Sequence, residues 1–366
     1  MTTTAAPRTA HPYLMHDAIL EQPEAIGRIL AEEGQSVDAL ARIATGSARI
    51  HIVGIGASWH AALVGEYLLR TIGTREDTRA WNSFEFCTTP PRLGGQDTVI
   101  VLSHRGTKTY SAQSLELARH HGAKTAIVTA IGSAADAGLA DVVVRTCKPE
   151  TSSAFTVSHT SAMTVLAMLA ARLGGSSADQ AASSFSTELE RLPDLVAGAL
   201  SQESAVREWA GGSKGVERFY FAGWGPNAST AYETALMMKE SSYTTTEGFQ
   251  LEQYLHGPFV STDEGCQVTF IAPPIAGADR VLDLIGAVKA VGAGTVAIVQ
   301  QDDGARSGLV DTVIEVPPTS ELLSPLVYLV PLQLFTYWLA VELGRNPDVF
   351  RLNDPKHVAA RESYRL

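Results

Sequence analysis

Cysteine is scarce in this sequence of 366 residues. The three cysteines, Cys87, Cys147 and Cys266, stand far apart and form no C-x-x-C pair. A sparse, odd set of this kind provides neither a disulfide framework nor a thiolate zinc site, and it is typical of a reducing compartment. We therefore expect a cytoplasmic protein without a metal centre.

Positive charge and long apolar runs are also in short supply. The chain has 28 Lys and Arg residues against 39 Asp and Glu residues, for a net charge of −11. Because nucleic-acid binding needs a basic face, this balance argues against a nucleic-acid partner. The first residues lack the apolar core of a signal peptide. The most apolar stretch, 322–343, contains two prolines and several polar residues, which predicts a buried helix and no membrane partner.

Short runs rich in valine and isoleucine alternate with helical patterns along the chain. This alternation is typical of parallel sheets with crossover helices. The predicted strands are 49–54, 79–86, 97–103, 124–130 and 141–146 in the first half, and 218–223, 266–273, 295–300 and 311–316 in the second.

The two halves repeat one another at an offset of about 170 residues. Gly54 corresponds to Gly223, and Asp141 to Asp311. A repeat this long indicates a duplicated domain, since solenoid units recur every 20–50 residues or so. We predict the following organisation: a helical lead-in over 1–40 with one amphipathic helix at about 13–32, a first domain over 41–176, a helical connector over 177–207, a second domain over 208–345 and a charged tail over 346–366.

Three loops of the first domain follow predicted strands and are rich in hydroxyl groups. In parallel sheets such loops meet at one end, and the helices that follow them offer free amides to an anion. The loop after 97–103 also carries two cations, so we expect it to bind a phosphate ester. The expected phosphate-binding residues are Gly56, Ala57, Ser58, Ser103, His104, Arg105, Thr107, Lys108, Ser153 and Thr156.

A dinucleotide site is the alternative that the stretch GIGASW raises. It has two of the three required glycines, Gly54 and Gly56, but Trp59 stands where a small residue is needed. Close packing against a pyrophosphate is therefore not expected. We predict no cofactor.

Several of these motifs resemble the sugar isomerase (SIS) family, and in particular the isomerase half of glucosamine-6-phosphate synthase. The stretches that carry the resemblance are GIGASWHAALVGEYLL, SHRGTK, YETALMMKESSYTTTEGFQLEQYLHGPF and the tail around NDPKHV. The resemblance implies two tandem SIS domains, each an α/β sandwich with a five-stranded parallel sheet. It also implies a homodimer with a shared active site and a small-molecule sugar phosphate as partner.

The same resemblance implies three catalytic residues. Glu240 falls on the family's proton-shuttling carboxylate, His256 on its ring-opening histidine and Lys356 on its tail lysine. These residue types suit aldose–ketose chemistry, because a half-buried carboxylate and a histidine exchange protons near neutral pH. A desolvated lysine can act as a nucleophile.

The chain departs from the synthases in ways that leave its reaction open. No cysteine precedes Cys87 and no glutaminase domain is present in the sequence, so we expect no glutaminase activity. Val157 and Met237 stand where the synthases have lysines, while Arg105 and Lys108 add charge to the phosphate loop. We expect an amino-sugar-phosphate isomerase or deaminase of the glucosamine-6-phosphate type. The alternatives are a fructosamine-6-phosphate deglycase and a non-catalytic sensor of sugar phosphates.

Overall fold

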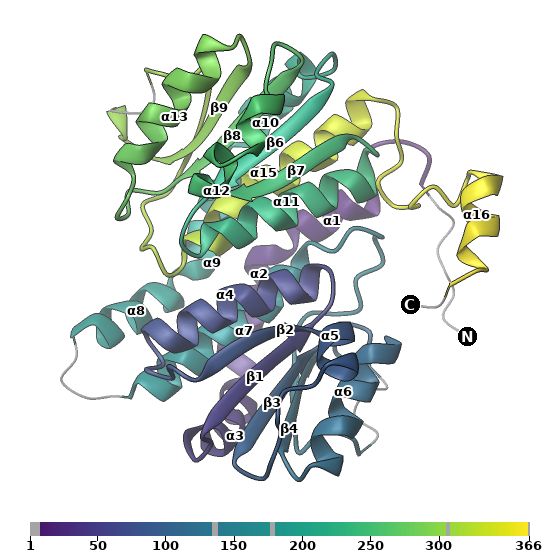
Figure 1. Cartoon of the computed structure of the whole chain (residues 1–366), viewed down its shortest axis with the longest axis vertical. Helices are drawn as coiled ribbons and strands as arrows, with labels where there is room; N and C mark the ends of the chain where they lie inside the picture. The colour runs from purple at the N-terminus through teal and green to yellow at the C-terminus, as the bar shows by residue number, and fades with distance from the viewer. Residues whose placement is uncertain (1–7, 134–137, 176–179, 305–307, 365–366) are drawn as a thin grey trace.

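Two lobes, each built on a parallel sheet, make up the computed structural model, which describes residues 8–133, 138–175, 180–304 and 308–364 (Figure 1). The first sheet has the strand order β2-β1-β3-β4-β5, and the second has the order β10-β9-β8-β6-β7. Every pairing in both sheets is parallel. The strands are β1 (Arg49–Gly54), β2 (Thr78–Asn82), β3 (Asp97–Leu102), β4 (Lys124–Thr129), β5 (Val142–Arg145), β6 (Arg218–Gly223), β7 (Thr245–Gln250), β8 (Cys266–Ala272), β9 (Gly294–Gln300) and β10 (Thr312–Val316).

Helices cover both faces of each sheet. Those of the first lobe and the lead-in are α1 (Leu14–Leu20), α2 (Gln22–Glu32), α3 (Gly34–Thr45), α4 (Ala57–Thr71), α5 (Ser83–Thr88), α6 (Thr109–His120) and α7 (Val157–Gly174). The remaining helices are α8 (Gln180–Glu190), α9 (Leu192–Leu200), α10 (Glu203–Gly212), α11 (Asn227–Ser241), α12 (Leu251–Leu255), the short 3-10 helix η2 (Pro258–Ser261), α13 (Asp279–Ala290), α15 (Ser324–Glu342) and α16 (Pro355–Arg361).

Eight of the nine predicted strands form with ends within two residues of the prediction. The prediction for 79–86 is wrong in its second half, because Asn82 caps a helix there by accepting a hydrogen bond from the amide of Phe84. Strand β7 was not predicted. It lies at the edge of its sheet, and only two of its six residues are buried, so its sequence TTEGFQ lacks the apolar run of a central strand.

Two predicted helical segments are each broken in the structure. The lead-in helix expected over 13–32 divides into α1 and α2 at Glu21, and Pro23 stands in the first turn of α2. The connector likewise divides into α8, α9 and α10, and Pro193 opens α9. Proline is accepted in the first turn of a helix but lacks the amide hydrogen that an uninterrupted helix needs.

The internal repeat is visible as matching contacts in the two lobes. A methyl group added to Gly54 would stand 2.5 Å from the backbone of Ser58, and one added to Gly223 would stand 2.3 Å from Asn227 O. Each glycine therefore lets its strand turn directly into the following helix. In the same way, Asp141 accepts a 2.8 Å hydrogen bond from the amide of Thr125, and Asp311 accepts one of the same length from Thr295.

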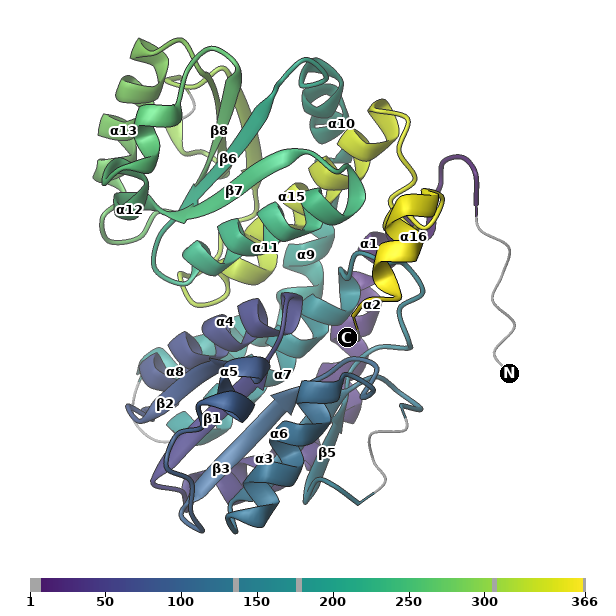
Figure 2. The same cartoon turned by 45° about the vertical axis from the view of Figure 1, so that its right-hand side comes forward.

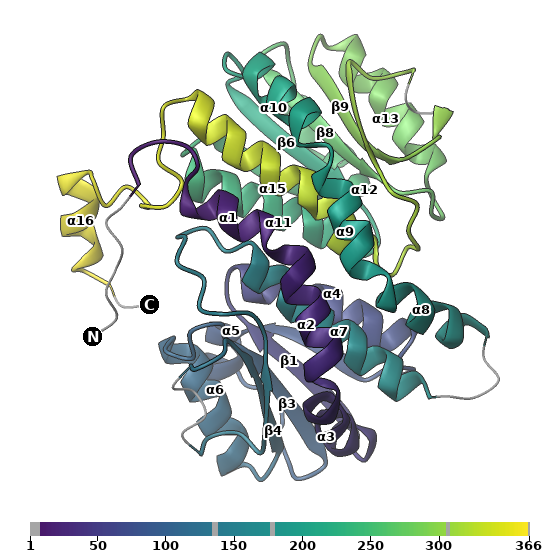
Figure 3. The same ribbon diagram turned by 180° about the vertical axis from the view of Figure 1, so that it is seen from behind.

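The two lobes share one core. Helices α4 and α7 of the first lobe face α11 and α15 of the second, and the largest hydrophobic cluster takes residues from both sheets, for example Ile52 and Phe219. The view from behind shows α1 and α2 crossing both lobes beside α15, α7 and α9 (Figure 3). The apolar stretch 322–343 forms α15. It is the one helix in the described ranges that is long and apolar enough to cross a membrane, but 94% of it is buried inside the protein, as the sequence predicts.

Candidate active site

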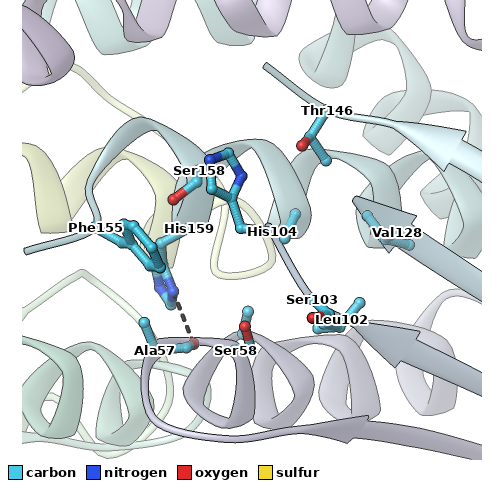
Figure 4. A pocket seen from close by; sticks show the side chains of 12 residues that line it. Ala57, Ser58, Leu102, Ser103, His104, Val128, Thr146, Phe155, Ser158 and His159 are labelled. Carbon is cyan, nitrogen blue, oxygen red and sulfur yellow. Dashed lines mark hydrogen bonds between the residues drawn. The ribbon is translucent and has the colours of Figure 1, made fainter. Parts of the chain in front are cut away.

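The loops after β1, β3 and β5 meet at the carboxyl end of the first sheet, where they line a small cavity (Figure 4). The first loop leads into α4, the second into α6 and the third into α7. The cavity measures about 20 Å³, which is room for about one water molecule. A sugar phosphate therefore enters only if lining side chains such as Phe155 move aside.

Two hydrogen-bond donors in this cavity lack a partner. The Ser103 hydroxyl is buried and no described group bonds to it. The Nε2 atom of His104 accepts a 2.8 Å hydrogen bond from the amide of Glu150, so the proton lies on Nδ1, which is also buried without a partner. Burial, with the nearby charge of Arg105, lowers the pKa of His104 to about 4, and the ring is neutral at pH 7. Unpaired buried donors of this kind point to a ligand that accepts hydrogen bonds.

The third loop is organised by a buried carboxylate, that of Glu150. Its two oxygens accept hydrogen bonds from the amides and hydroxyls of Thr156 and Ser158 and from the hydroxyl of Ser152, at 2.6–3.0 Å. Burial raises the pKa of Glu150, and these donors oppose the rise. The carboxylate thus takes the amides at the start of α7 that the sequence assigns to a phosphate.

Two of the expected phosphate ligands, Thr156 and Ser153, use their hydroxyl groups to bond to other parts of the protein. Thr156 is fully buried, and both of its donors bond to Glu150. The Ser153 hydroxyl donates to the carbonyl oxygen of Asp348 in the C-terminal tail. Neither hydroxyl proton is directed into the cavity, and the part of the third loop that lines it is Phe155 and the following turn.

The two cations of the β3 loop face different neighbours. Arg105 lies against the third loop: its guanidinium is 5.2 Å from the ring centroid of Phe155 and 3.5 Å from Glu150 O. Lys108 precedes α6 and is half-buried, and its side-chain amine has no hydrogen-bond or ion-pair partner among the described residues. Burial and the charge of Arg105 lower the pKa of Lys108, while the carboxylate of Glu240 raises it. Lys108 therefore lies in electrostatic range of the second lobe.

The remaining expected phosphate ligands lie around the same cavity. Ala57 and Ser58 line it, and Gly56 immediately precedes them with φ 59°, a left-handed conformation that favours glycine. Thr107, by contrast, is exposed on the β3 loop.

Glu240 lies in the last turn of α11, on the second lobe. Burial and the charges of Glu233 and Glu150 together raise the pKa of Glu240 to about 8, with the charge of Lys108 acting against them. A carboxyl with this pKa exchanges a proton readily near neutral pH, as an acid/base catalyst must. Glu240 thus lies within electrostatic range of Lys108 on the β3 loop of the first lobe.

A buried network that the sequence did not predict joins the two lobes behind this site. Glu233, two turns before Glu240 on α11, is 2.7 Å from Nδ1 of His60 in α4. Its other carboxylate oxygen, Oε1, is buried without a partner in the described part of the chain. Burial alone would raise the pKa of Glu233, but the neighbouring His159 and the hydrogen bond from His60 outweigh it, and the pKa is lowered. His159 in turn donates from Nδ1 to Ala57 O and lines the cavity.

The other two expected catalytic residues lie outside this cluster in the single chain. The His256 side chain is 71% exposed and is 3.3 Å from Glu252 at the end of α12. Lys356 is exposed in the first turn of α16, where its amide bonds to the capping carboxylate of Asp354. Figure 1 and Figure 2 show α16 at the edge of the molecule, outside both sheets.

Comparison with known proteins places the chain in a family. The SIS domain model matches twice, over residues 45–172 and 214–343. The chain belongs to the SIS domain family. Each match contains one of the two parallel sheets, so the lobes are two tandem SIS domains, as the sequence predicts.

The curated relatives include the glutamine–fructose-6-phosphate aminotransferase [isomerizing] of Thermococcus kodakarensis, which is 32% identical over 356 residues and 95% of this chain. The enzyme of the same name from Methanothermobacter thermautotrophicus is 31% identical over 97% of the chain. This chain spans 58% of the length of each of these relatives.

Solved structures with the same fold include the C-terminal domain of glucosamine-fructose-6-phosphate aminotransferase from Francisella tularensis, with a TM-score of 0.86 and 22% identity over 94% of this chain and 100% of that one. A glucosamine-6-phosphate deaminase from Thermotoga maritima superimposes with a TM-score of 0.74 and 20% identity, over 92% of this chain and 97% of that one.

The second SIS domain does not repeat the cavity of the first. At the positions of Ser103 and His104 it has Ala272 and Pro273, neither of which has a side-chain hydrogen-bond donor. Trp224, in the turn after β6, is buried there, and its indole nitrogen donates a 2.8 Å hydrogen bond to Ala276 O in the loop after β8. The unpaired donors Ser103 and His104 thus have no counterpart at this place in the second SIS domain.

Within the ranges that the structure describes, no group of three or more His, Cys, Asp or Glu side chains is arranged to hold a metal ion. One sequence signal did point to the interlobe network. His60 belongs to the first SIS motif, and Glu233 lies on the same helical face as Glu240, seven residues earlier. Their contact is not predictable without knowing that α4 packs against α11.

Proposed function

We propose that this protein is an enzyme that acts on an amino-sugar 6-phosphate through its open-chain form. It would either isomerise the sugar or release its amine as ammonia. The observation that carries the proposal is the juxtaposition of Glu240, whose pKa is about 8, with the donor-lined cavity of the first SIS domain through Lys108. Such a pair joins a general acid/base to an anion site. The activities named in the relatives, isomerising aminotransferase and deaminase, support the same chemistry.

In this proposal each group has a distinct task. Ser103 and His104 donate hydrogen bonds to the phosphate, and Arg105 neutralises its charge. Glu240 takes a proton from one of the carbons C1 and C2 and returns it to the other. Since the two carbons are adjacent, one carboxylate is enough for both transfers.

His256 and Lys356 complete the proposed site from outside the cluster. We propose that His256 comes from the second subunit of a homodimer and opens the sugar ring. In support, His256 and its neighbour Val260, which is 90% exposed, stand at the surface of this chain. Lys356 would form an imine with the carbonyl of the open chain, in which the carbonyl oxygen leaves as water.

A second candidate reaction is favoured by the charges around the cavity. Two further cations, Arg105 and Arg361, each lie within electrostatic range of Lys108, and Arg361 belongs to the tail. A phosphate monoester alone does not need three. A deglycase that cleaves a sugar-phosphate–amino-acid adduct would use the additional charge to bind the carboxylate of the amino acid.

The purified protein tests both reactions when it is offered glucosamine 6-phosphate, galactosamine 6-phosphate and fructoselysine 6-phosphate, with ammonia, free amino acid and ketose phosphate measured separately. Release of ammonia or ketose phosphate from an amino sugar supports the proposal, and release of lysine supports the deglycase. Binding of these compounds without turnover would contradict both and favour a sensor.

Two variants locate the chemistry. Glu240→Gln should abolish turnover and leave binding intact, whereas Glu247→Gln, at an exposed position on β7, should change neither. Mixing Glu240→Gln with His256→Ala tests the shared site. If subunits exchange and each dimer has two shared sites, the mixture recovers part of the activity that each variant lacks. No recovery in mixed dimers isolated by differential tags would contradict the shared site.

A further inference from the structure

Besides the hydrogen bond from Asn346 to the carbonyl oxygen of Arg8, the C-terminal tail is attached to the body at two places before α16 begins. The first is Asp348. Its carboxylate accepts hydrogen bonds from the amides of Leu14 and Met15, at 2.8 and 2.9 Å, and so caps α1. Its carbonyl oxygen accepts the hydroxyl proton of Ser153 in the third loop of the first SIS domain. One residue therefore connects the tail to the lead-in helix and to a loop beside the cavity.

The second attachment is to Tyr243, three residues after Glu240. The amide of Arg351 donates a 2.9 Å hydrogen bond to the Tyr243 hydroxyl. The Arg351 guanidinium lies 4.5 Å from the centroid of the same ring, and that of Arg345 lies 5.9 Å from it. The tail is thus attached to the chain segment that carries Glu240.

The backbone is strained where these groups meet. Tyr243, Phe350 and Arg351 have φ values of 60°, 43° and 57°, in the left-handed region. Only two other non-glycine residues in the described ranges, Thr74 and Asp302, have positive φ. Strain of this kind persists only where the surrounding contacts hold it, and it concentrates at functional sites.

Beyond these attachments the tail has little support of its own. Helix α16 has no buried residue, and Lys356 is exposed on it. Its contacts back to the anchored segment are Arg361, whose guanidinium lies 3.4 Å from Phe350 O and 5.6 Å from the Phe350 ring, and His357, whose Nε2 lies 3.4 Å from the Arg351 guanidinium. The position of Lys356 therefore depends on the residues that precede α16.

We propose that Asp348 and Tyr243 are positioning residues that hold the tail so that the Lys356 amine reaches the substrate beside Glu240. The inference rests on the proposed role of Lys356. Its physical basis is proximity: an amine on a tethered tail has a high effective concentration at the carbonyl only while the tether is fixed. Tyr243 is suited to hold the tail because it lies three residues after Glu240, in the same chain segment that positions this carboxylate.

The test measures imine formation on Lys356 directly. The protein is incubated with fructose 6-phosphate and sodium borohydride, which reduces the C=N bond to a stable secondary amine and leaves the sugar attached to the lysine. The modified peptide is quantified by mass spectrometry. In parallel, kcat and KM are measured with the substrate identified above.

Tyr243→Phe removes the hydroxyl and keeps the ring on which the arginines stack. We expect the labelling of Lys356 and kcat to fall about tenfold, the loss that follows from one hydrogen bond of about 1.4 kcal/mol, with KM changed less than twofold. Asp348→Asn tests the other attachment and should act in the same direction. Tyr364→Phe, an exposed tyrosine on the same tail, is the matched control and should match the unmodified protein.

Hydrogen exchange separates positioning from damage to the fold. In both variants the amides of the tail should exchange faster, while those of β1 and β3 keep their protection. Normal labelling and kcat in Tyr243→Phe and Asp348→Asn would overturn the inference, even where Lys356→Ala is inactive. An active, unlabelled Lys356→Ala would instead overturn the role of the lysine itself, and the inference with it.

Discussion

The buried charge of Glu233 should set the pH at which Glu240 gains and loses its proton. The two carboxylates are seven residues apart on α11, which corresponds to about 10.5 Å along the helix axis. At an effective dielectric constant of about 20, two like charges at that distance repel by about 1.6 kcal/mol, or slightly more than one pH unit. The variant Glu233→Gln removes this repulsion, since glutamine keeps the shape and can still accept a hydrogen bond from His60.

The direction of the change follows from the sign of the interaction. A negative charge at position 233 disfavours ionisation of Glu240 and raises its pKa, together with burial and Glu150 and against Lys108. Neutralising Glu233 should therefore move the limb of the kcat–pH profile that reports Glu240 to lower pH by about one unit. The pH profile is the measurement that a merely structural role would not shift.

Two comparisons make this prediction testable. Glu247→Gln, at an exposed position on β7, should leave the profile in place. Glu240→Gln should remove the limb together with the activity. A Glu233→Gln enzyme that is folded and active, with its pH profile unmoved, would refute the electrostatic coupling.

Three further predictions concern the phosphate, the response to acid and the internal repeat. Arg105→Ala should raise KM for phosphorylated substrates about tenfold, which is the effect of losing one charge-assisted hydrogen bond. Lys124→Ala, at the opposite end of the first sheet, should leave KM unchanged. If Arg105→Ala has the same KM as the unmodified protein, Arg105 does not bind the phosphate. Burial lowers the pKa of His51 to about 4, so on acidification the unfolded chain takes up the proton at a higher pH than the folded one. The free energy of unfolding should therefore be highest above about pH 6.5 and fall by about 3 kcal/mol on acidification to pH 4. In denaturant titrations, the acid-induced loss of unfolding free energy should be smaller in His51→Gln than in the unmodified protein by about this 3 kcal/mol. An equal loss in the two proteins would mean that His51 has an ordinary pKa. Gly54→Ala should destabilise the fold by about 2–3 kcal/mol, because the new methyl group would stand 2.5 Å from the Ser58 backbone. Gly34→Ala is the control and should leave stability unchanged, because no atom lies within 4 Å of the added methyl group. Equal melting temperatures of the two variants would contradict the close approach at Gly54.

The strands that the sequence predicts best are those buried on both faces. In β3 every residue is buried, so the apolar run DTVIVL identifies it without knowledge of its neighbours. The segment 79–86 was harder, because its first half pairs with β1 while its second half begins a helix at an asparagine cap. The polar edge strand β7 was missed for the related reason that only two of its six residues are buried, so it has no apolar run.

In the candidate site, too, part of the arrangement is predictable from the sequence and part is not. The loops that line the cavity follow predicted strands, so their meeting at one end of the sheet was predictable. The hydrogen-bond partners of the side chains in these loops were not predictable. Thr156 belongs to the expected hydroxyl-rich loop, yet its hydroxyl and amide bond to Glu150, a residue that the sequence did not single out.

The sequence by itself determined the parallel strands, the duplication and the positions of the loops, because backbone hydrogen bonding and apolar burial leave a periodic trace in neighbouring residues. Only the tertiary structure decided which donors are left unpaired, which acid keeps its proton and where the tail is attached. Glu240 and Tyr243 take these properties from groups that are distant in the chain: burial and the charge of Glu150 in the first lobe help to raise the pKa of Glu240, and the amide of Arg351 bonds to Tyr243 from the tail. Desolvation and hydrogen bonding depend on what surrounds an atom in space, and no local pattern of residues records that.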